Sequence, residues 1–275
     1  MSILPSLTAP SPILGLSHVG VKATDIERSC AFYREFLGFS EHCRLNYLAT
    51  GELMLVCFKV NDDQWIEVFT GLKPGESRLH QIAFRVTDAE QIRRSLAARH
   101  FAVPEKTPIG QMGNFNFVVP DPSGQIVEFV QPLPTGITER DRGKFLPATR
   151  VATQLRHARV VVSDLALDES FYAALGMVAQ SHSTVPGDQP DLKLRQTIAG
   201  DFVEFVADLE SETVFSLEVG DVAETVAQLE RSPYRPRYAG SLKPQTTPDG
   251  TAYLDLFDPD GICVRLIEPA LAPAN

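Results

Sequence analysis

The chain has 275 residues, which corresponds to about two domains of roughly 150 residues each. A hydrophobic content of 44% and a charged content of 22% are typical of a globular protein and exclude a chain that is disordered throughout. With 35 acidic and 25 basic residues the net charge is -10, so we expect neither nucleic acid nor an anionic membrane surface as a partner. The four cysteines form no CxxC motif, which favours a reducing compartment, and we expect the protein in the cytoplasm.

The elements follow a repeated order along the chain. Residues 1–13 contain three prolines and no basic segment, which predicts a flexible leader rather than a signal peptide. An apolar strand then precedes a helix, predicted from the apolar spacing between Ile26 and Leu37, and three strands around 41–48, 53–60 and 64–70. Residues 79–131 repeat this order, with a predicted helix over 88–99 and strands near 103–107, 114–119 and 125–131. Thr24 and Thr87, each three residues before a glutamate, are the predicted N-caps of the two helices.

The second half of the chain repeats the first. The segments LSHVGVKATDIERSCAFYREFLGF and LRHARVVVSDLALDESFYAALGM, which begin at Leu16 and Leu155, carry His, Asp and Phe-Tyr at the same intervals. DPSGQIVEFVQP at 121–132 likewise corresponds to DPDGICVRLIEP at 258–269. We therefore predict an α+β protein of four tandem βαβββ units that form two domains with cup-shaped mixed sheets.

The repeats also set the expected domain limits. We predict a first domain over 14–131, a second over 153–269 and a short tail over 270–275. Residues 132–152 contain prolines, glycines and mixed charges without periodicity, and are the predicted linker.

Four polar residues interrupt apolar strands of the first half: His18 in LSHVGV, Glu67 in WIEVF, His80 in LHQIAF and Glu128 in IVEFV. Desolvating an unpaired carboxylate costs on the order of several kcal/mol, so buried residues of this kind need partners. Each unit contributes one such residue on its first strand and one on its last, and a pseudo-twofold axis between units would bring the four together. Such a set can bind a divalent transition metal, although strand alternation also allows Glu67 to face solvent.

HVGV with FYREFLGF, then HQIAFRVTD, then DPSGQIVEF resemble the first, fifth and last strands of the vicinal oxygen chelate superfamily. This superfamily includes glyoxalase I, methylmalonyl-CoA epimerase, extradiol dioxygenases, and fosfomycin and bleomycin resistance proteins. The resemblance implies that His18, His80 and Glu128 are metal ligands and that Glu67 takes the fourth position, where bacterial glyoxalase I has a glutamate. The implied cofactor is one divalent transition metal: Fe, Mn, Ni, Co or Zn.

The second half departs from this pattern. His157 and Glu204 match the first two ligand positions, but Thr213 stands where the second histidine was and Arg265 replaces the last glutamate. Because arginine is permanently protonated, Arg265 cannot bind a cation, and we expect one metal site per chain. Arg265 either binds an anion in the second cup or forms a buried ion pair.

Two pairings of the units stay open. If consecutive units pair, as in extradiol dioxygenases, the site consists of His18, Glu67, His80 and Glu128. If units pair across the halves, as in swapped glyoxalases, the site consists of His80, Glu128, His157 and Glu204. We favour the first pairing, because a long linker suggests two separately closed domains.

The resemblance implies an enzyme that chelates a small oxygenated substrate through two adjacent oxygens, in a monomer or a homodimer. The main prediction is proton transfer through an enediolate, as in a glyoxalase-like lyase, isomerase or epimerase, with Glu67 as base and Glu128 as the alternative. Asn116 is the predicted substrate-orienting residue. Extradiol ring cleavage is disfavoured because GNFNFVVPDPSG lacks the His and Tyr that this class carries ahead of its last glutamate. A non-catechol iron dioxygenase and a protein that sequesters a small molecule remain alternatives.

Overall fold

The computed structural model describes residues 12–180, 193–197, 200–207 and 214–269. Most of the predicted leader, the predicted tail and Thr213 lie outside the described residues. The strands of the first half are β1 (Ile13–Ala23), β2 (Ser40–Asn46), β3 (Leu53–Lys59), β4 (Trp65–Thr70), β5 (Leu79–Val86), β6 (Phe115–Pro120) and β7 (Ile126–Gln131). Those of the second half are β8 (Gln154–Val161), β9 (Val178–Gln180), β10 (Lys193–Gln196), β11 (Phe202–Val206), β12 (Val214–Glu218), β13 (Gln245–Thr246), β14 (Ala252–Phe257) and β15 (Cys263–Ile267). The helices are α1 (Ile26–Ala31), α2 (Ala89–Ala98), α3 (Ile137–Arg140), α4 (Leu165–Ala174) and α5 (Val222–Glu230), with a π-helical turn over Phe32–Phe36 and a 3₁₀ turn over Arg235–Arg237.

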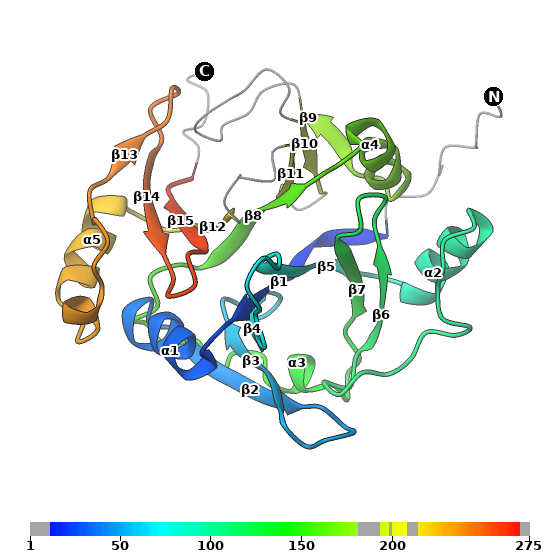
Figure 1. Cartoon of the computed structure of the whole chain (residues 1–275), viewed down its shortest axis with the longest axis horizontal. Coiled ribbons are helices and arrows are strands. Elements are labelled where there is room, and N and C mark those ends of the chain that lie inside the picture. Colours follow the sequence, from blue (N-terminus) through cyan, green and yellow to red (C-terminus); the bar gives the residue numbers. More distant parts are fainter. Residues whose placement is uncertain (1–11, 181–192, 198–199, 208–213, 270–275) are drawn as a thin grey trace.

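Each half of the chain forms one mixed sheet (Figure 1). The first sheet has the order β2-β3-β4-β1-β5-β7-β6 and the second β13-β14-β15-β12-β8-β11-β10-β9. In the first sheet, β1 is parallel to β4 and β5 is parallel to β7, while β1 and β5 pair antiparallel. The first and last strands of two consecutive units therefore occupy the centre of one sheet. Units pair within the halves, and the arrangement that would join His80 and Glu128 to His157 and Glu204 is not formed.

An aspartate caps the helix of every unit. The carboxylates of Asp25 and Asp88 accept hydrogen bonds from backbone N–H groups three residues later, and Asp164 and Asp221 do the same in the second half. The expected caps Thr24 and Thr87 were thus one residue too early. Asparagine and aspartate rank with serine as the best N-caps, so either neighbour was chemically suitable.

Two segments differ from the expected elements. Residues 103–107 form an irregular segment rather than a strand, and the carbonyl of Pro104 accepts a hydrogen bond from Arg93 Nη1 on α2. Proline has no N–H to give to a neighbouring strand, which explains the missing ladder. Within the expected linker, α3 packs beside the first sheet, where Ile137 N donates to the carbonyl of Met112.

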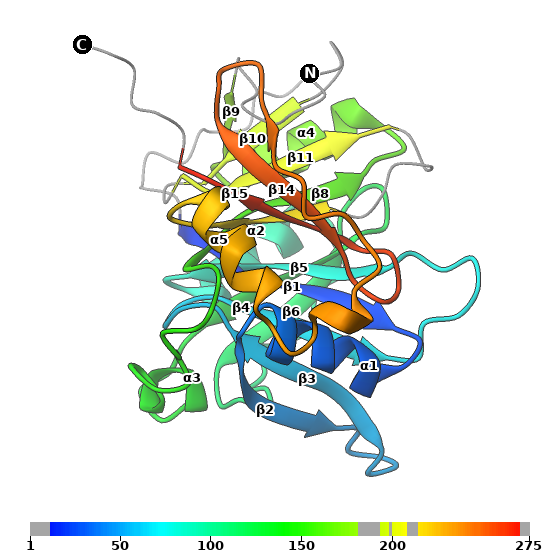
Figure 2. The same cartoon turned by 90° about the vertical axis from the view of Figure 1, so that its left-hand side faces the viewer.

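The two halves pack against each other, as the perpendicular view shows (Figure 2). Helical segments take part in this junction: Phe36 of the π-helical turn contacts Tyr238 of the second half, and Tyr172 of α4 contacts Phe84 of β5. Strands β1 and β8 lie at this junction, and the buried Gln64 side chain donates to the carbonyls of both Leu16 and Leu155. Tyr33 of the first half donates to Asp258 of the second, and Tyr172 of the second half donates to Asp121 of the first. No helix among the described residues is long and apolar enough to cross a membrane.

Candidate metal centre

The centre of the first sheet carries a buried cluster of three potential metal ligands. His18 on β1, Glu67 on β4 and Glu128 on β7 present ligating atoms that all lie within 4.8 Å of one another. His18 Nε2 is 3.3 Å from Glu67 Oε2 and 3.1 Å from Glu128 Oε2. None of the three side chains is more than 9% exposed. The sequence prediction placed these three residues together, and the structure does so.

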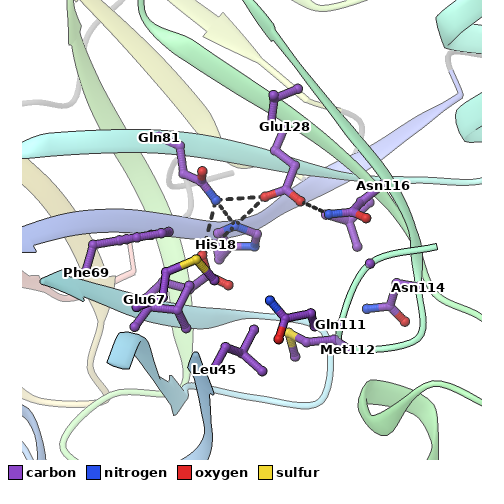
Figure 3. Close-up of a pocket in the computed structure, with 15 residues that line it drawn as sticks. His18, Leu45, Glu67, Phe69, Gln81, Gln111, Met112, Asn114, Asn116 and Glu128 are labelled. Carbon is purple, nitrogen blue, oxygen red and sulfur yellow. Dashed lines mark hydrogen bonds and ion pairs between the residues drawn. The ribbon is translucent and has the colours of Figure 1, made fainter. Parts of the chain in front are cut away.

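The fourth position of the cluster belongs to Gln81 and not to His80. Gln81 Nε2 on β5 lies 2.9 Å from His18 Nε2 and donates to Glu67 Oε2 at 3.1 Å and to Glu128 Oε2 at 2.7 Å (Figure 3). The ladder between β5 and β1 shifts register between Leu79 and Gln81, so a β-bulge interrupts strand alternation at His80. Its ring packs against Phe69, with 4.1 Å between the ring centroids, and burial lowers its pKa to about 4. His80 is not among the three potential ligands that lie together, although its contact Phe69 lines the cavity, and its role as a metal ligand stays a prediction.

Neighbouring side chains hold the ligand groups in place. The indole of Trp65 stacks on the His18 ring at a centroid distance of 5.1 Å, and its Nε1 donates to Glu67 Oε1 at 3.1 Å. Asn116 on β6 donates through Nδ2 to Glu128 Oε1 at 2.5 Å. Strand parity left the facing of Asn116 undecided in the sequence, and the structure turns it toward the cluster, where it orients Glu128.

The protonation of the cluster follows from burial and mutual charge. Burial lowers the pKa of His18, but the carboxylates of Glu67 and Glu128 outweigh it and raise this pKa overall. Burial also raises the pKa of Glu67. Burial acts in the same direction on Glu128, yet hydrogen bonds from His18, Asn116 and Gln81 bring its pKa below the usual value. The two glutamates are thus chemically distinct although they face the same imidazole.

The donor set fits a divalent cation. Two carboxylates buried beside one imidazole leave a negative charge that a protonated His18 cannot fully neutralise, whereas a divalent cation can. The Gln81 amide points at the same spot, and rotating its amide group by 180° presents Oε1 to a cation in place of Nε2. One nitrogen and three oxygen donors can therefore converge on one position.

A cavity of about 340 Å³ opens beside the cluster. Figure 3 shows His18, Glu67, Gln81 and Glu128 on one side of it and Leu45, Gln111 and Met112 on the other. Its volume lies in the range of small-molecule sites, which is about 300–1,000 Å³. The arrangement can place a small molecule directly against the four donor groups.

The corresponding face of the second sheet carries cations in place of a ligand cluster. Glu204 Oε2 lies 2.9 Å from His157 Nε2, and it accepts a hydrogen bond from Arg159 Nε at 2.6 Å. Arg265 donates to both carboxylate oxygens of Asp255, at 2.7 and 2.9 Å. Among the described residues, only the first sheet gathers three potential ligands, and Arg265 forms the buried ion pair that was one of its two expected roles.

Comparison with known proteins places this geometry in a family. Residues 15–129 match the family model described as the Glyoxalase/Bleomycin resistance protein/Dioxygenase superfamily. A search of curated proteins gave no match.

Three solved structures illustrate the similarity of the whole chain. The 2,3-dioxygenase LapB from Pseudomonas sp. KL28 is 17% identical with a TM-score of 0.71, covering 97% of this chain and 96% of its own. Homoprotocatechuate 2,3-dioxygenase from Arthrobacter globiformis is 14% identical with a TM-score of 0.68, covering 100% and 86%. The Mn(II)-bound glyoxalase from Novosphingobium aromaticivorans is 14% identical with a TM-score of 0.69, covering 95% and 84%.

At these identities the solved structures show a shared fold and no particular reaction. The arrangement of two sheets built from repeated units is that of the two-domain extradiol dioxygenases. Residues 15–129, which carry the ligand cluster, therefore belong to the glyoxalase/bleomycin resistance/dioxygenase, or vicinal oxygen chelate, superfamily, and the whole chain has the fold of its two-domain members.

Proposed function

We propose that the protein is a metal-dependent enzyme that binds a small substrate through two adjacent oxygens and catalyses proton transfer next to a carbonyl group. The observation that carries this proposal is the buried convergence of His18, Glu67, Gln81 and Glu128 beside a cavity of about 340 Å³. A bound divalent cation would supply Lewis acidity that polarises the substrate oxygens and stabilises negative charge on them. No disulfide joins any of the four cysteines, all of which lie among the described residues, and this is consistent with a cytoplasmic location.

The donor set supports this chemistry more than a redox reaction. With one imidazole, two carboxylates and one amide, oxygen donors predominate, and such donors suit Mn²⁺ and similar hard cations. The potential ligands that lie together among the described residues are one histidine and two carboxylates, whereas the iron dioxygenase triad has two histidines and one carboxylate.

Glu67 is the proposed base, and Glu128 is the alternative. Both carboxylates line the cavity, so either can reach a proton on a small substrate held there. Glu128 is held by His18, Gln81 and Asn116, which stabilise its ionised form and weaken it as a base. Glu67 accepts from Trp65 and Gln81 and has no second amide clamp. The proposal therefore gives Glu128 the role of a fixed ligand and Glu67 the role of proton acceptor.

Isotope exchange tests the proposed reaction. We expect the Mn²⁺-loaded protein, incubated with 2-hydroxyacetophenone in deuterated water, to incorporate deuterium at the carbon beside the carbonyl, as followed by NMR. Glu67→Gln should abolish the incorporation, while His80→Ala serves as the matched control and should retain it. If the protein binds the ketone equally well with and without metal and exchanges no deuterium, it sequesters small molecules instead.

A non-catechol iron dioxygenase is the second candidate. It is favoured by structural neighbours such as the 2,3-dioxygenase LapB and homoprotocatechuate 2,3-dioxygenase. An oxygen electrode separates the two candidates: consumption of oxygen by the Fe²⁺-loaded protein with an added substrate, without solvent deuterium in the product, would move the assignment to this class.

A further inference from the structure

We infer that the cavity beside the His18, Glu67 and Glu128 cluster selects an uncharged substrate, with two adjacent oxygens carried on an apolar arm, and discriminates against molecules that bear a carboxylate or a phosphate. The inference that the substrate carries two adjacent oxygens rests on the proposed function. The absence of charge and the apolar arm are argued from the cavity itself.

The cavity offers no partner for an anion. Among the described residues that line it, there is no lysine and no arginine, and its two ionisable acids are Glu67 and Glu128. Their two negative charges already balance a divalent cation, so a carboxylate added to the site would be buried without a counter-charge. The chain as a whole has a net charge of -10, which also repels anions from its surface.

The cations on the neighbouring strands are already paired. Lys22 stands opposite Phe69 in the β1–β4 ladder, but its Nζ lies 3.3 Å from Glu76 Oε2 and it does not line the cavity. Lys59 stands opposite Trp65 in the β3–β4 ladder, but its Nζ donates to Asp62 at 2.7 Å and to the carbonyl of Asp141 at 2.6 Å. Its side chain is only 2% exposed. Arg85, further along β5, pairs with Asp63 at 2.9 Å. None of these side chains lines the cavity, so none is available to a bound anion.

Beyond the four donor groups, most side chains that line the cavity are apolar. The apolar side chains include those of Leu45, Leu55, Phe69, Met112, Val118 and Val130. The loops that follow Leu45 and precede Gln111 carry Leu48 and Ile109, which are 88% and 63% exposed. Gln111 Nε2 donates to the carbonyl of Asn46 and joins these two loops. A hydrocarbon arm thus has apolar side chains to contact both within the cavity and in the loops beside it.

Three probes separate charge from the apolar arm. 2-Hydroxyacetophenone carries two adjacent oxygens on a phenyl ring and is neutral, phenylglyoxylate places a carboxylate on the same skeleton, and hydroxyacetone lacks the ring. We expect calorimetry with the Mn²⁺-loaded protein to show 2-hydroxyacetophenone binding at least about tenfold more tightly than either other probe.

A matched pair of variants tests the cause of this preference. Gln111→Lys places a cation at the cavity wall and should tighten phenylglyoxylate binding by at least about fivefold. Leu167→Lys adds the same charge at an exposed position of α4 that does not line the cavity, and should leave the affinities of all three probes unchanged.

The outcomes distinguish this inference from the proposed function. Phenylglyoxylate binding as tightly as 2-hydroxyacetophenone, hydroxyacetone binding as tightly as either, or no binding of any probe would overturn the inference. If Mn²⁺ fails to bind, the proposed function fails. The same comparison of probes on the metal-free protein then still decides whether the cavity prefers a neutral molecule with an apolar arm.

Discussion

At the scale of single residues, the histidines His18 on β1 and His80 on β5 lie in different environments, and their replacement should have different effects. His18→Ala removes the only imidazole of the cluster and should weaken Mn²⁺ binding by at least about a hundredfold, because a direct ligand is lost. His80→Ala should leave the affinity nearly unchanged, since His80 is not among the potential ligands that lie together. Trp65 is the single tryptophan of the chain and stacks on His18, so quenching of its emission by Mn²⁺ reports site occupancy. Elemental analysis after gel filtration provides the measurement for His18→Ala, whose Trp65 environment also changes. Equal losses in the two variants would show that β5 presents His80 to the metal.

Asn116 and Asn114 lie two residues apart and provide a second matched comparison. Asn116→Ala removes the hydrogen bond to Glu128 and should weaken Mn²⁺ binding by about 10–100-fold, the usual effect of losing a group that orients a ligand. Asn114→Ala instead removes a hydrogen bond to Thr138 on α3 and should lower the free energy of unfolding by about 1 kcal/mol while metal affinity stays the same. Titration of Trp65 emission and urea unfolding measure the two effects. Weakened metal binding in Asn114→Ala alone would contradict the assigned roles.

The ligand cluster was predictable from the sequence except at the one position where two polar residues are neighbours. His80 and Gln81 both interrupt the apolar strand, and residue type alone favoured the histidine. Parity gives a divided signal: Ile82 and Phe84 belong to the main apolar core, which turns Gln81 toward the cup. Leu79 belongs to the same core, because β5 shifts register against β1 between Leu79 and Gln81, and the sequence does not reveal this bulge. In the same way, Arg159 on β8 stands where β1 has Gly20, which marks the second cup as cationic before Arg265 is considered.

At the scale of elements, the end of the first helical segment depends on a glycine that cannot be replaced. Gly38 has φ of +74°, and a Cβ built there would lie 2.3 Å from the carbonyl oxygen of Thr149. That oxygen also accepts a hydrogen bond from Gln228, so it is not free to move. Gly51 has the same φ but has nothing within 4 Å of a built Cβ.

This pair of glycines separates conformational strain from steric overlap. Gly51→Ala should cost about 1 kcal/mol of unfolding free energy, the usual cost of a left-handed alanine. Gly38→Ala should cost more than about 3 kcal/mol, because the overlap with a fixed backbone adds to that strain. Urea unfolding of both variants measures the difference. Equal losses would mean that the segment around Thr149 moves away from α1 without cost.

Periodicity identified the unit helices and most strands because these elements bury one face, which leaves a repeat in the sequence. It missed α3, which has only four residues and packs through Ile137 and a backbone hydrogen bond to Met112. It also assigned a strand to 103–107, where the apolar residues suit a strand but Pro104 interrupts the pairing. Short and proline-containing segments are positioned by tertiary contacts, and these leave no periodic signal.

At the scale of the whole molecule, the duplication was visible in the sequence but the contacts between the halves were not. The repeated Phe-Tyr and Asp-Pro motifs, which identified the copies, form reciprocal bonds across the junction: Tyr33 with Asp258, and Tyr172 with Asp121. A motif common to both halves can bond within its own half or across to the other, and only the packing of the sheets decides. The same residues therefore gave the fold without giving the interface.

These reciprocal pairs predict a pH dependence of stability. Burial raises the pKa of Asp258 and of Asp121 to about 6 in each case, above the ordinary value near 3.8. A raised folded pKa means that the folded state binds the proton more tightly, so the stabilisation is present at low pH and is lost as the pH rises through about 6. When the pH falls from 8 to 5, protonation of each carboxyl in the folded state should raise the free energy of unfolding by about 1 kcal/mol.

Asparagine at these positions keeps the hydrogen-bonding shape and removes the titration. The free energy of unfolding of Asp258→Asn minus that of the native protein should be about 1 kcal/mol lower at pH 5 than at pH 8. Asp121→Asn should show the same change. Urea unfolding of native and variant proteins at both pH values measures this difference and cancels the titration of all other groups.

Because the two pairs occupy opposite ends of the junction and share no partner, the double variant should show the sum of the two differences. A double variant with the pH profile of either single variant would instead show that the two ends of the junction open together, as one cooperative unit.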